Sequence, residues 1–510
     1  MAIITTNEFG MILYNILIFA FGFWNVFKKN KTLSPVFGLG FLAALALSLL
    51  GIYYSQHNMG DKILQTSALL LGIGVLGYIL IALSKNKLAQ IGAIIMAAVG
   101  FNMYINNPHT PIDPSIKLDQ HAELLIRLDH DDKAELTKTL NELSFVSSIE
   151  AMLTPIDADA TELDDYIKLD VNDKFDINLA ISEIGQISGV EWIEPNEELQ
   201  LELLKTKAPE TKTDFVSSVN DPLSERQWNM QTLNMASYYE LFKSKDYQPI
   251  KTAKLFILDS GVDRKHEDLR LNFASHTAQD RSANESDSHG HGTHCAGVAA
   301  AVTNNGVGIA SMNPGSEWVT VSSVKVMNNF GFGSQARIIE GIIEAVDAGA
   351  DVISMSLGGK STQIKEEAYL DAIDYAESHN VIIIAAAGNN AGDAAEITPA
   401  NSEKIIVVTA LDKQLKKAQF SNFITNTNYG VAAPGVSIMS PWRNGRYAAF
   451  DGTSMATPHV SGLVAVMRSL NPKLTTKQVF NILDKTGSKT KDPGLTGNMI
   501  NPTAAIKAVF

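Results

Sequence analysis

The C-terminal half of this chain alternates short apolar strands with amphipathic helices, which leaves few folds open to it. The expected elements are strands 255–259 and 319–327, helix 335–348, strand 352–356, helix 366–378, and strands 381–387 and 405–410. Such alternation predicts an α/β fold built on a doubly wound parallel sheet. Ligands bind at the carboxyl ends of the strands in such a sheet, and Asp259, Ser356 and Asn389 fall at these ends.

Ser454 lies between a glycine-containing turn and a helix, in the segment 451–462. Apolar residues recur at helical spacing from Val460 to Leu470, so Ser454 falls in the first helical turn. Free N–H groups and the helix dipole favour negative charge there, and an oxyanion beside Ser454 would be stabilised. Taken alone, the segment is more typical of an ordinary serine N-cap.

A serine hydroxyl becomes a strong nucleophile when a base takes its proton and a third group orients that base. Asp259 ends a buried apolar strand and is followed by a turn. His291 lies between two glycines, which permit close approach, and a helix of small residues follows it. These two residues are candidates for the third group and the base.

In the chain order Asp, His, Ser, these motifs resemble those of the subtilisin-like serine proteases, and the resemblance covers residues 215–510. It implies a serine endopeptidase in which Ser454 attacks the scissile carbonyl, His291 accepts and returns the proton, and Asp259 holds the imidazolium. It also implies that the Asn389 side-chain amide and the Ser454 N–H bind the oxyanion.

The same resemblance implies how a protein or peptide substrate is bound. Two segments would pair with the substrate backbone as added strands, and others would form the primary side-chain pocket. The residues implied are Gly331, Phe332 and Gly333 on one side, Ser356, Leu357 and Gly358 on the other, Ala386, Ala387 and Gly388 in the pocket wall, and Ile397 near its floor. If Ile397 partly fills the pocket, small or medium P1 side chains are expected.

A structural calcium ion is also implied by the resemblance. Asp221 and Asp268 resemble two carboxylate ligands of the family's tight site, and the loop 302–309 resembles the segment that supplies the others. The backbone carbonyls of Val302, Val307 and Ile309 and the side chain of Asn305 would complete an oxygen-only shell, which suits Ca²⁺.

The first 107 residues are expected to form an all-α transmembrane four-helix domain. Residues 9–27, 35–54, 63–83 and 88–105 are apolar and contain no Asp, Glu, Lys or Arg, and each can span about 30 Å of hydrocarbon. A cleavable signal peptide fits poorly, because Glu8 precedes the first stretch and three more stretches follow. The membrane would therefore be bound through residues 9–105.

Lysines in the loops predict the orientation of this domain. The first and third loops carry most of them and should face the cytoplasm, which places both chain ends outside. The lysines are Lys28, Lys29 and Lys31 in the first loop, Lys62 in the second, and Lys85 and Lys87 in the third. The chain is therefore expected to be a multi-pass protein of the cell membrane with an extracytoplasmic catalytic domain. Processing would release that domain from the membrane.

Negative charge is concentrated in the middle of the chain. Residues 108–219 contain 25 acidic and 9 basic residues, a net charge of 9 − 25 = −16, against −14 for the whole chain. The positive and negative charges of the flanking parts therefore nearly cancel. No strongly basic segment indicates a nucleic-acid partner.

Strands and helices at 108–204 are expected in a split βαβ, ferredoxin-like α+β arrangement. Residues 190–198 resemble the end of the prosegment that precedes subtilisin-like domains. This implies an intramolecular inhibitor whose last residues occupy the substrate cleft; a plain adaptor domain is the alternative. The polar stretch 205–219, which contains Pro209, is expected to be an exposed linker where self-cleavage occurs, ahead of a catalytic domain at 220–510.

Three other interpretations compete with this one. The spacing of Asp287, His289, His291 and His294 could be drawn as a zinc site, although Asp259, Asn389 and Ser454 would then have no role. A membrane-anchored peptide-binding protein without turnover would keep the same fold. An intramembrane protease finds no support, because the four apolar stretches contain no Ser/His or paired-Asp constellation.

Overall fold

The computed structural model describes residues 116–120, 122–201, 204–206, 219–245, 247–278, 287–360 and 367–510. The chain divides into two units, residues 1–110 and 111–510, and every described residue belongs to the second. The four apolar stretches expected to cross a membrane lie outside the described residues. Within the described ranges, no helix combines the length and the apolar character that a membrane span requires.

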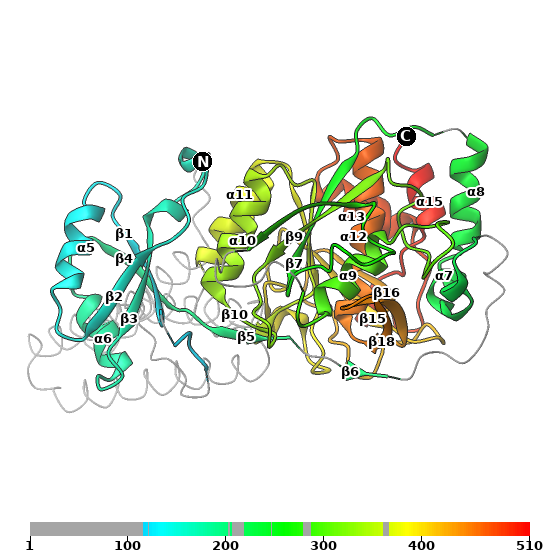
Figure 1. Ribbon diagram of the computed structural model, residues 1–510. Coiled ribbons are helices and arrows are strands. Elements are labelled where there is room, and N and C mark those ends of the chain that lie inside the picture. The colour runs from blue at the N-terminus through cyan, green and yellow to red at the C-terminus, as the bar shows by residue number, and fades with distance from the viewer. Residues whose placement is uncertain are drawn as a thin grey trace, which may run out of the picture. The chain divides into compact units, whose positions relative to one another are not determined.

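Residues 122–195 form a small α+β domain (Figure 1). Its elements are β1 (Leu124–Leu128), α5 (Lys133–Asn141), β2 (Val146–Ala151), β3 (Tyr166–Val171), α6 (Ile177–Ile184) and β4 (Val190–Pro195). The antiparallel strands are ordered β2-β3-β1-β4, which is the split βαβ arrangement expected from the sequence. Helix α6 begins at a true N-cap, because the Asp176 carboxylate accepts the N–H groups of Asn178 and Leu179.

Both faces of strand β1 are buried. Leu124, Ile126 and Leu128 pack under α5 and α6, in one core with Leu136 and Ile181. Leu125 points to the opposite face, where it joins a cluster formed mainly by the second domain. A strand buried on both faces indicates that this sheet is covered by helices of two different domains.

The second domain is built on a seven-stranded parallel sheet in the order β16-β15-β13-β11-β7-β9-β8 (Figure 1). The strands are β7 (Ala253–Asp259), β8 (Phe273–Ala278), β9 (Val319–Lys325), β11 (Val352–Met355), β13 (Ile382–Ala386), β15 (Ile406–Leu411) and β16 (Gly430–Pro434). The main helices are α9 (His291–Ala300), α10 (Gln335–Asp347), α11 (Glu367–Ser378) and α12 (Thr453–Leu470). The predicted doubly wound parallel sheet is confirmed; β8 and β16 were not among the expected strands.

The alternation of side chains along β7 explains why helices cover both faces of the sheet. Leu255 and Ile257 pack in the cluster that contains α9 and α12, whereas Phe256 and Leu258 pack in the cluster that contains α10 and α11. Successive side chains of a strand point to opposite faces, so a run of apolar residues requires helices on both sides.

Shorter elements complete the domain. They are α7 (Trp228–Thr232), α8 (Met235–Lys245), β10 (Phe332–Ser334), β12 (Gly359–Lys360), β14 (Ile397–Thr398), β17 (Ile438–Trp442), β18 (Arg446–Asp451), α13 (Thr476–Thr486), α14 (Pro493–Thr496) and α15 (Pro502–Lys507). Two further strands, β5 (Glu198–Gln200) and β6 (Leu204–Lys205), come from the segment that joins the two domains, and pair with β10 and β18. Position 205, expected to open an exposed linker, therefore lies in a paired strand; residues 207–218 are outside the described ranges.

Candidate active site

Asp259 and His291 are held together at the carboxyl end of β7. The Asp259 carboxylate accepts a hydrogen bond from His291 Nδ1 at 2.8 Å, and both side chains are fully buried. His291 is the first residue of α9, and a Cβ on the next residue, Gly292, would lie only 2.1 Å from the carbonyl oxygen of Gly261. Glycine at this position therefore lets α9 approach the end of β7 closely enough for the ring to reach the carboxylate.

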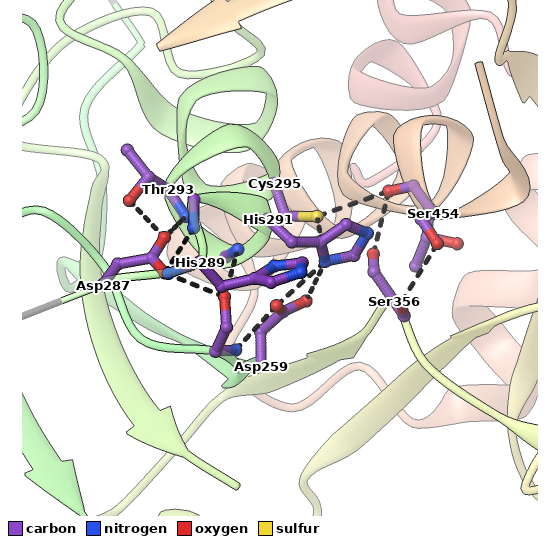
Figure 2. Close-up of polar contacts among 12 residues, drawn as sticks. Asp259, Asp287, His289, His291, Thr293, Cys295, Ser356 and Ser454 are labelled. Atoms are coloured by element: carbon purple, nitrogen blue, oxygen red, sulfur yellow. Dashed lines mark hydrogen bonds and ion pairs between the residues drawn. The ribbon is translucent and has the colours of Figure 1, made fainter. Parts of the chain in front are cut away.

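Ser454 lies on the other side of the His291 ring (Figure 2). It is the second residue of α12, and its hydroxyl donates to the backbone oxygen of Ser356 at 3.0 Å. Buried Nε2 of His291 makes no hydrogen bond within the described part of the chain. Cys295 contacts both partners, since its sulfur lies 3.9 Å from His291 Nδ1 and 3.5 Å from the Ser454 carbonyl oxygen.

Within the described residues no hydrogen bond joins Ser454 to His291, because the Ser454 hydroxyl donates to the Ser356 carbonyl instead. Rotation about the single Cα–Cβ bond of Ser454 moves its Oγ between staggered positions at low cost. Hydrogen bonds of a catalytic group are commonly long or misaligned before a substrate is bound. The arrangement leaves a base with a free nitrogen on the side of a hydroxyl nucleophile.

Electrostatics favour proton acceptance by His291. Burial lowers the pKa of the ring, but the neighbouring Asp259 carboxylate raises it, and the net result is a pKa well above the usual 6.5. Burial raises the pKa of the Cys295 thiol, so this cysteine stays neutral beside the base. An imidazole stabilised in its charged form beside a buried carboxylate is suited to take a proton from a hydroxyl.

Asn389 follows β13 and is oriented by Thr453. Its Oδ1 accepts both the backbone N–H and the hydroxyl of Thr453, each at 2.9 Å. With Oδ1 engaged by two donors, the amide NH₂ group is the end left for an acceptor. Asn389 and Ser454 line one cavity of about 210 Å³, so both can face the same developing charge.

Most residues expected in the substrate cleft surround this cavity. Its lining comprises Gln200, Leu201, Ser356, Leu357, Gly358, Gly359, Lys360, Ala386, Gly388, Asn389, Asn390, Ile397, Thr453 and Ser454. Ala387 is fully buried and not in this lining, which corrects its expected place in the pocket wall. Ile397 fits its expected place, because its side chain lies about 3 Å from where a Cβ on Gly358 or Gly388 would be.

Gly331, Phe332 and Gly333 lie beside the cavity and not in its lining. Gly333 and Phe332 pair antiparallel with Leu199 and Gln200 of the chain itself. The carbonyl of Gly331 accepts the N–H of Leu201 at 2.8 Å. This edge therefore pairs with an extended segment of the chain itself, and its pairing with a substrate stays a prediction.

The four residues of the possible zinc site do not converge, and that interpretation is wrong. The Asp287 carboxylate accepts the N–H groups of His289, Gly290 and Thr293, so it caps the start of α9. His294 donates Nε2 to the carbonyl of Ile438, and burial lowers its pKa to about 3. In the described ranges these four residues form no cluster of metal-ligand atoms.

The expected calcium ligands lie together. Asp221 accepts the N–H groups of Asn304 and Asn305, whereas Asp268 accepts the N–H of Ile309 and the side-chain amide of Asn305. Burial raises the pKa of both carboxyls, that of Asp268 to about 7. In the described residues, neither carboxylate pairs with a lysine or arginine. Two buried carboxylates without a lysine or arginine partner among the described residues, next to the Asn305 side chain, fit a hard divalent cation.

Sequence reasoning missed three residues of the site. Thr453 orients Asn389, and Lys360 and Asn390 line the cavity. No local sequence signal identifies them, because each acts through a contact between distant segments.

Known proteins resemble this chain in the same region. Residues 251–499 match the model of the Subtilase family. Subtilisin DY of Bacillus licheniformis is 36% identical over 258 residues, 49% of this chain and 90% of that protein. Thermitase of Thermoactinomyces vulgaris is 37% identical over 252 residues, 49% of this chain and 85% of that protein.

Two solved structures of proteases are also similar to this chain. A protease from Pseudoalteromonas arctica PAMC 21717 has a TM-score of 0.51 and 26% identity, covering 57% of this chain and 100% of that chain. Fervidolysin from Fervidobacterium pennivorans has a TM-score of 0.63 over 78% of this chain and 62% of its own, and at 21% identity it supports the fold alone. The chain belongs to the subtilase family, and it is a serine endopeptidase.

Proposed function

We propose that this protein is a membrane-tethered, outward-facing endopeptidase that hydrolyses peptide bonds through an acyl-enzyme and matures by cutting itself from its small domain. Asp259, His291 and Ser454 are the proposed triad, and Asn389 is the proposed oxyanion donor. The observation that carries the proposal is the His291 ring, which is bonded through Nδ1 to buried Asp259 and whose Nε2, on the side of Ser454, has no hydrogen-bond partner among the described residues.

In the proposed mechanism, the Ser454 hydroxyl turns from the Ser356 carbonyl to His291 Nε2 and gives up its proton as Oγ attacks the scissile carbonyl. The Asp259 carboxylate stabilises the imidazolium. The Ser454 N–H and the Asn389 amide donate to the oxyanion. His291 returns the proton to the departing amine, and a water molecule then hydrolyses the ester by the same route.

The small domain is proposed to be an intramolecular inhibitor, and its polar contacts support this. Helix α10 has no side-chain N-cap of its own at Ser334. Instead, the N–H of Ala336 donates to Asn196 Oδ1 at 2.9 Å, and the N–H of Gln335 donates to the Glu197 carbonyl at 2.9 Å. The small domain thereby satisfies N–H groups that the first turn of a helix leaves free.

Apolar burial supports the same docking. Leu125, Tyr166, Leu199 and Leu201 of the small domain and its connection lie in one buried cluster with residues of α10 and α11, including Tyr369. Burial at about 25 cal/mol per Å² makes such a cluster a large favourable contribution to docking. Because Leu201 also lines the catalytic cavity, the docked domain would exclude substrate.

Structural calcium is part of the proposal. Asp221, Asp268, Asn305 and the carbonyls of the loop 302–309 would hold it. When bound, the ion would neutralise two buried carboxylates and fix a loop that follows α9, the helix that carries His291.

Membrane anchoring is proposed from the amino-acid sequence of residues 9–105 alone, because the four charge-free stretches need a hydrocarbon environment. The enclosed position of Ile397 between Gly358 and Gly388 supports a preference for small or medium P1 side chains. A peptide library cleaved mainly after Phe, Tyr or Trp would contradict that preference.

Active-site labelling of the intact chain in detergent tests the proposal against a binding protein without turnover. A fluorophosphonate should label wild type at Ser454 and leave Ser454→Ala unlabelled, and only wild type should hydrolyse casein. Wild-type protein that binds peptides but neither reacts nor hydrolyses them would refute the protease assignment. A zinc-selective chelator should leave hydrolysis unchanged.

A further inference from the structure

Three side chains of the small domain that can bind a metal ion converge outside the catalytic site. His130 lies in the turn between β1 and α5, and Asp164 and Asp165 lie in the short 3₁₀ helix η2 (Leu163–Asp165), which leads into β3. His130 Nδ1 is 2.7 Å from Asp165 Oδ1 and 3.9 Å from Asp164 Oδ2. One ligand atom of each residue lies within 4.8 Å of the other two. Zinc bonds of about 2.0–2.2 Å place tetrahedral ligand atoms about 3.4 Å apart, between the two distances observed here.

The two carboxylates are shielded, whereas the imidazole is open to solvent. The side chains of Asp164 and Asp165 are 20% and 11% exposed, against 71% for His130. In the ranges that the structure describes, no lysine or arginine forms an ion pair with either carboxylate; Lys133 donates to the backbone carbonyl of Asp164. The hydrogen bond to Asp165 and the negative charges of Asp165 and Asp164 raise the pKa of His130. A bound cation would take the place of the proton that this negative potential attracts.

The donor set indicates which cation fits. One imidazole nitrogen and two carboxylate oxygens are typical of Zn²⁺ and similar first-row divalent ions, with water in a fourth position. Calcium takes oxygen ligands, so the set at Asp221 and Asp268 suits calcium and the set in the small domain does not. The two groups of residues should therefore differ in the metal that they select.

The residues on either side of Asp164 and Asp165 contact the catalytic domain. Leu163 is fully buried in the cluster that contains α10 and α11. The hydroxyl of Tyr166 donates to Asp371 Oδ2 of α11 at 3.1 Å. Side chains three positions apart in a 3₁₀ helix lie on one face, so Leu163 and Tyr166 face the enzyme while the two carboxylates face the turn after β1. Whatever fixes η2 therefore also fixes part of the docking surface.

We propose that His130, Asp164 and Asp165 bind Zn²⁺ or a chemically similar divalent ion, and that this ion tightens the docking of the small domain on the enzyme. The ion joins the turn after β1 to η2, and a segment that is ordered before docking loses less conformational freedom when it docks. The effect on docking rests on the proposed inhibition by the small domain; the metal site does not. The released enzyme lacks all three residues, so its hydrolysis does not require zinc.

Zinc binding is tested on the intact Ser454→Ala chain, in detergent and with calcium as the one other added metal. Zinc chloride is titrated against a chromogenic chelator, which gives the number of bound ions and their affinities. His130→Ala and Asp165→Asn should each weaken one site at least about 100-fold, because loss of a group that only supports a ligand already costs about 10–100-fold. His379→Ala is the matched control, since His379 Nε2 lies 3.6 Å from a single carboxylate, that of Asp157, and it should change nothing. Zinc affinities that are the same with and without the His130 imidazole would overturn the site.

Docking is measured on the cut complex by dilution, with hydrolysis of a fluorogenic peptide reporting the free enzyme. Saturating zinc should lower the dissociation constant of the small domain at least about fivefold, the lower end of the usual coupling between two sites. The complex that carries His130→Ala should not respond. Because Asp259, His291 and Cys295 also offer three ligand atoms to one cation, the released enzyme at the same zinc concentration is the reference. A dissociation constant that zinc leaves unchanged in wild type would overturn the tightening.

Failure of this inference can be told from failure of the proposed function. A small domain that inhibits the enzyme equally well with and without zinc, in a chain that binds no zinc through His130, would refute the inference alone. A cut complex that hydrolyses peptide as fast as the released enzyme while the small domain stays bound would refute inhibition. The titration of the intact chain would still decide the metal site.

Discussion

Lys168, on β3 of the small domain, provides a direct test of inhibition by that domain. Its Nζ lies 2.9 Å from Oε1 of Glu340 on α10, and only 16% of the lysine and 9% of the glutamate side chain are exposed. A second partner, Glu150, lies 3.7 Å away and is 67% exposed, so its interaction with Lys168 contributes little. The shielded pair with Glu340 is therefore the contact whose loss should weaken docking.

Lys168→Met removes the cation and keeps most of the apolar stem. Truncating one partner of a buried, hydrogen-bonded charge pair costs about 2–5 kcal/mol. The Leu153 N–H still donates to Glu340 Oε1 at 3.3 Å, so we expect the lower end of that range. A loss of about 2 kcal/mol corresponds to a dissociation constant for the small domain that is roughly 30-fold higher.

The assay starts from the cut complex, which is diluted until hydrolysis of a fluorogenic peptide reports the free enzyme. Lys138→Met, which changes an exposed lysine on α5, is the matched control and should leave the dissociation constant unchanged. Lys168→Met combined with Glu340→Met should recover most of the loss, because replacing both members of a shielded pair is close to neutral. A dissociation constant for Lys168→Met within about threefold of wild type would refute the reasoning.

Three further outcomes are expected. Asp259→Asn should lower kcat about 10⁴-fold, and because the carboxylate raises the pKa of His291, the acidic limb of the pH–rate profile should move to lower pH in the variant. Asn389→Ala should lower kcat about 10²–10³-fold with little change in KM, measured on a small peptide; an equal rise in KM alone would contradict oxyanion binding. If the free calcium concentration is about 100 times the calcium dissociation constant, removing calcium with EDTA should lower the free energy of unfolding by about 2.7 kcal/mol. The melting temperature should then fall by roughly 5–10 °C, and Asp221→Asn should abolish this effect of EDTA.

The parallel sheet and the positions of Asp259, Asn389 and Ser454 were predictable because they rest on local pattern. Apolar runs mark β7 and β13, and a polar residue directly after such a run must lie at the carboxyl edge of the sheet. The flanking glycines of His291 likewise indicate close packing before the contact with Gly261 is known. These signals lie within ten residues of the group they position.

The residues that pair in β5, and the pairing of β6 as a whole, were not predictable, because each strand has two or three residues and a partner more than a hundred positions away. Segments this short show no periodicity, and position 205 looks like linker for that reason. The zinc interpretation failed on a similar point: spacing puts Asp287 near three histidines, but only the fold shows that its carboxylate caps α9.

Inhibition and cutting depend on different parts of the same connection. Asn196, which caps α10, and Leu199, which packs beside the cleft, both lie N-terminal to the stretch 205–219 where self-cleavage is expected, so breaking the chain there removes neither contact. Dissociation then uncaps a helix, which costs about 0.5–2 kcal/mol, and exposes the apolar cluster. Activity should therefore appear after the cut and not with it, with a delay that shortens in Lys168→Met. Activity that rises in step with the first fragments would mean that the small domain leaves as soon as it is cut, and that the docking contacts do not inhibit.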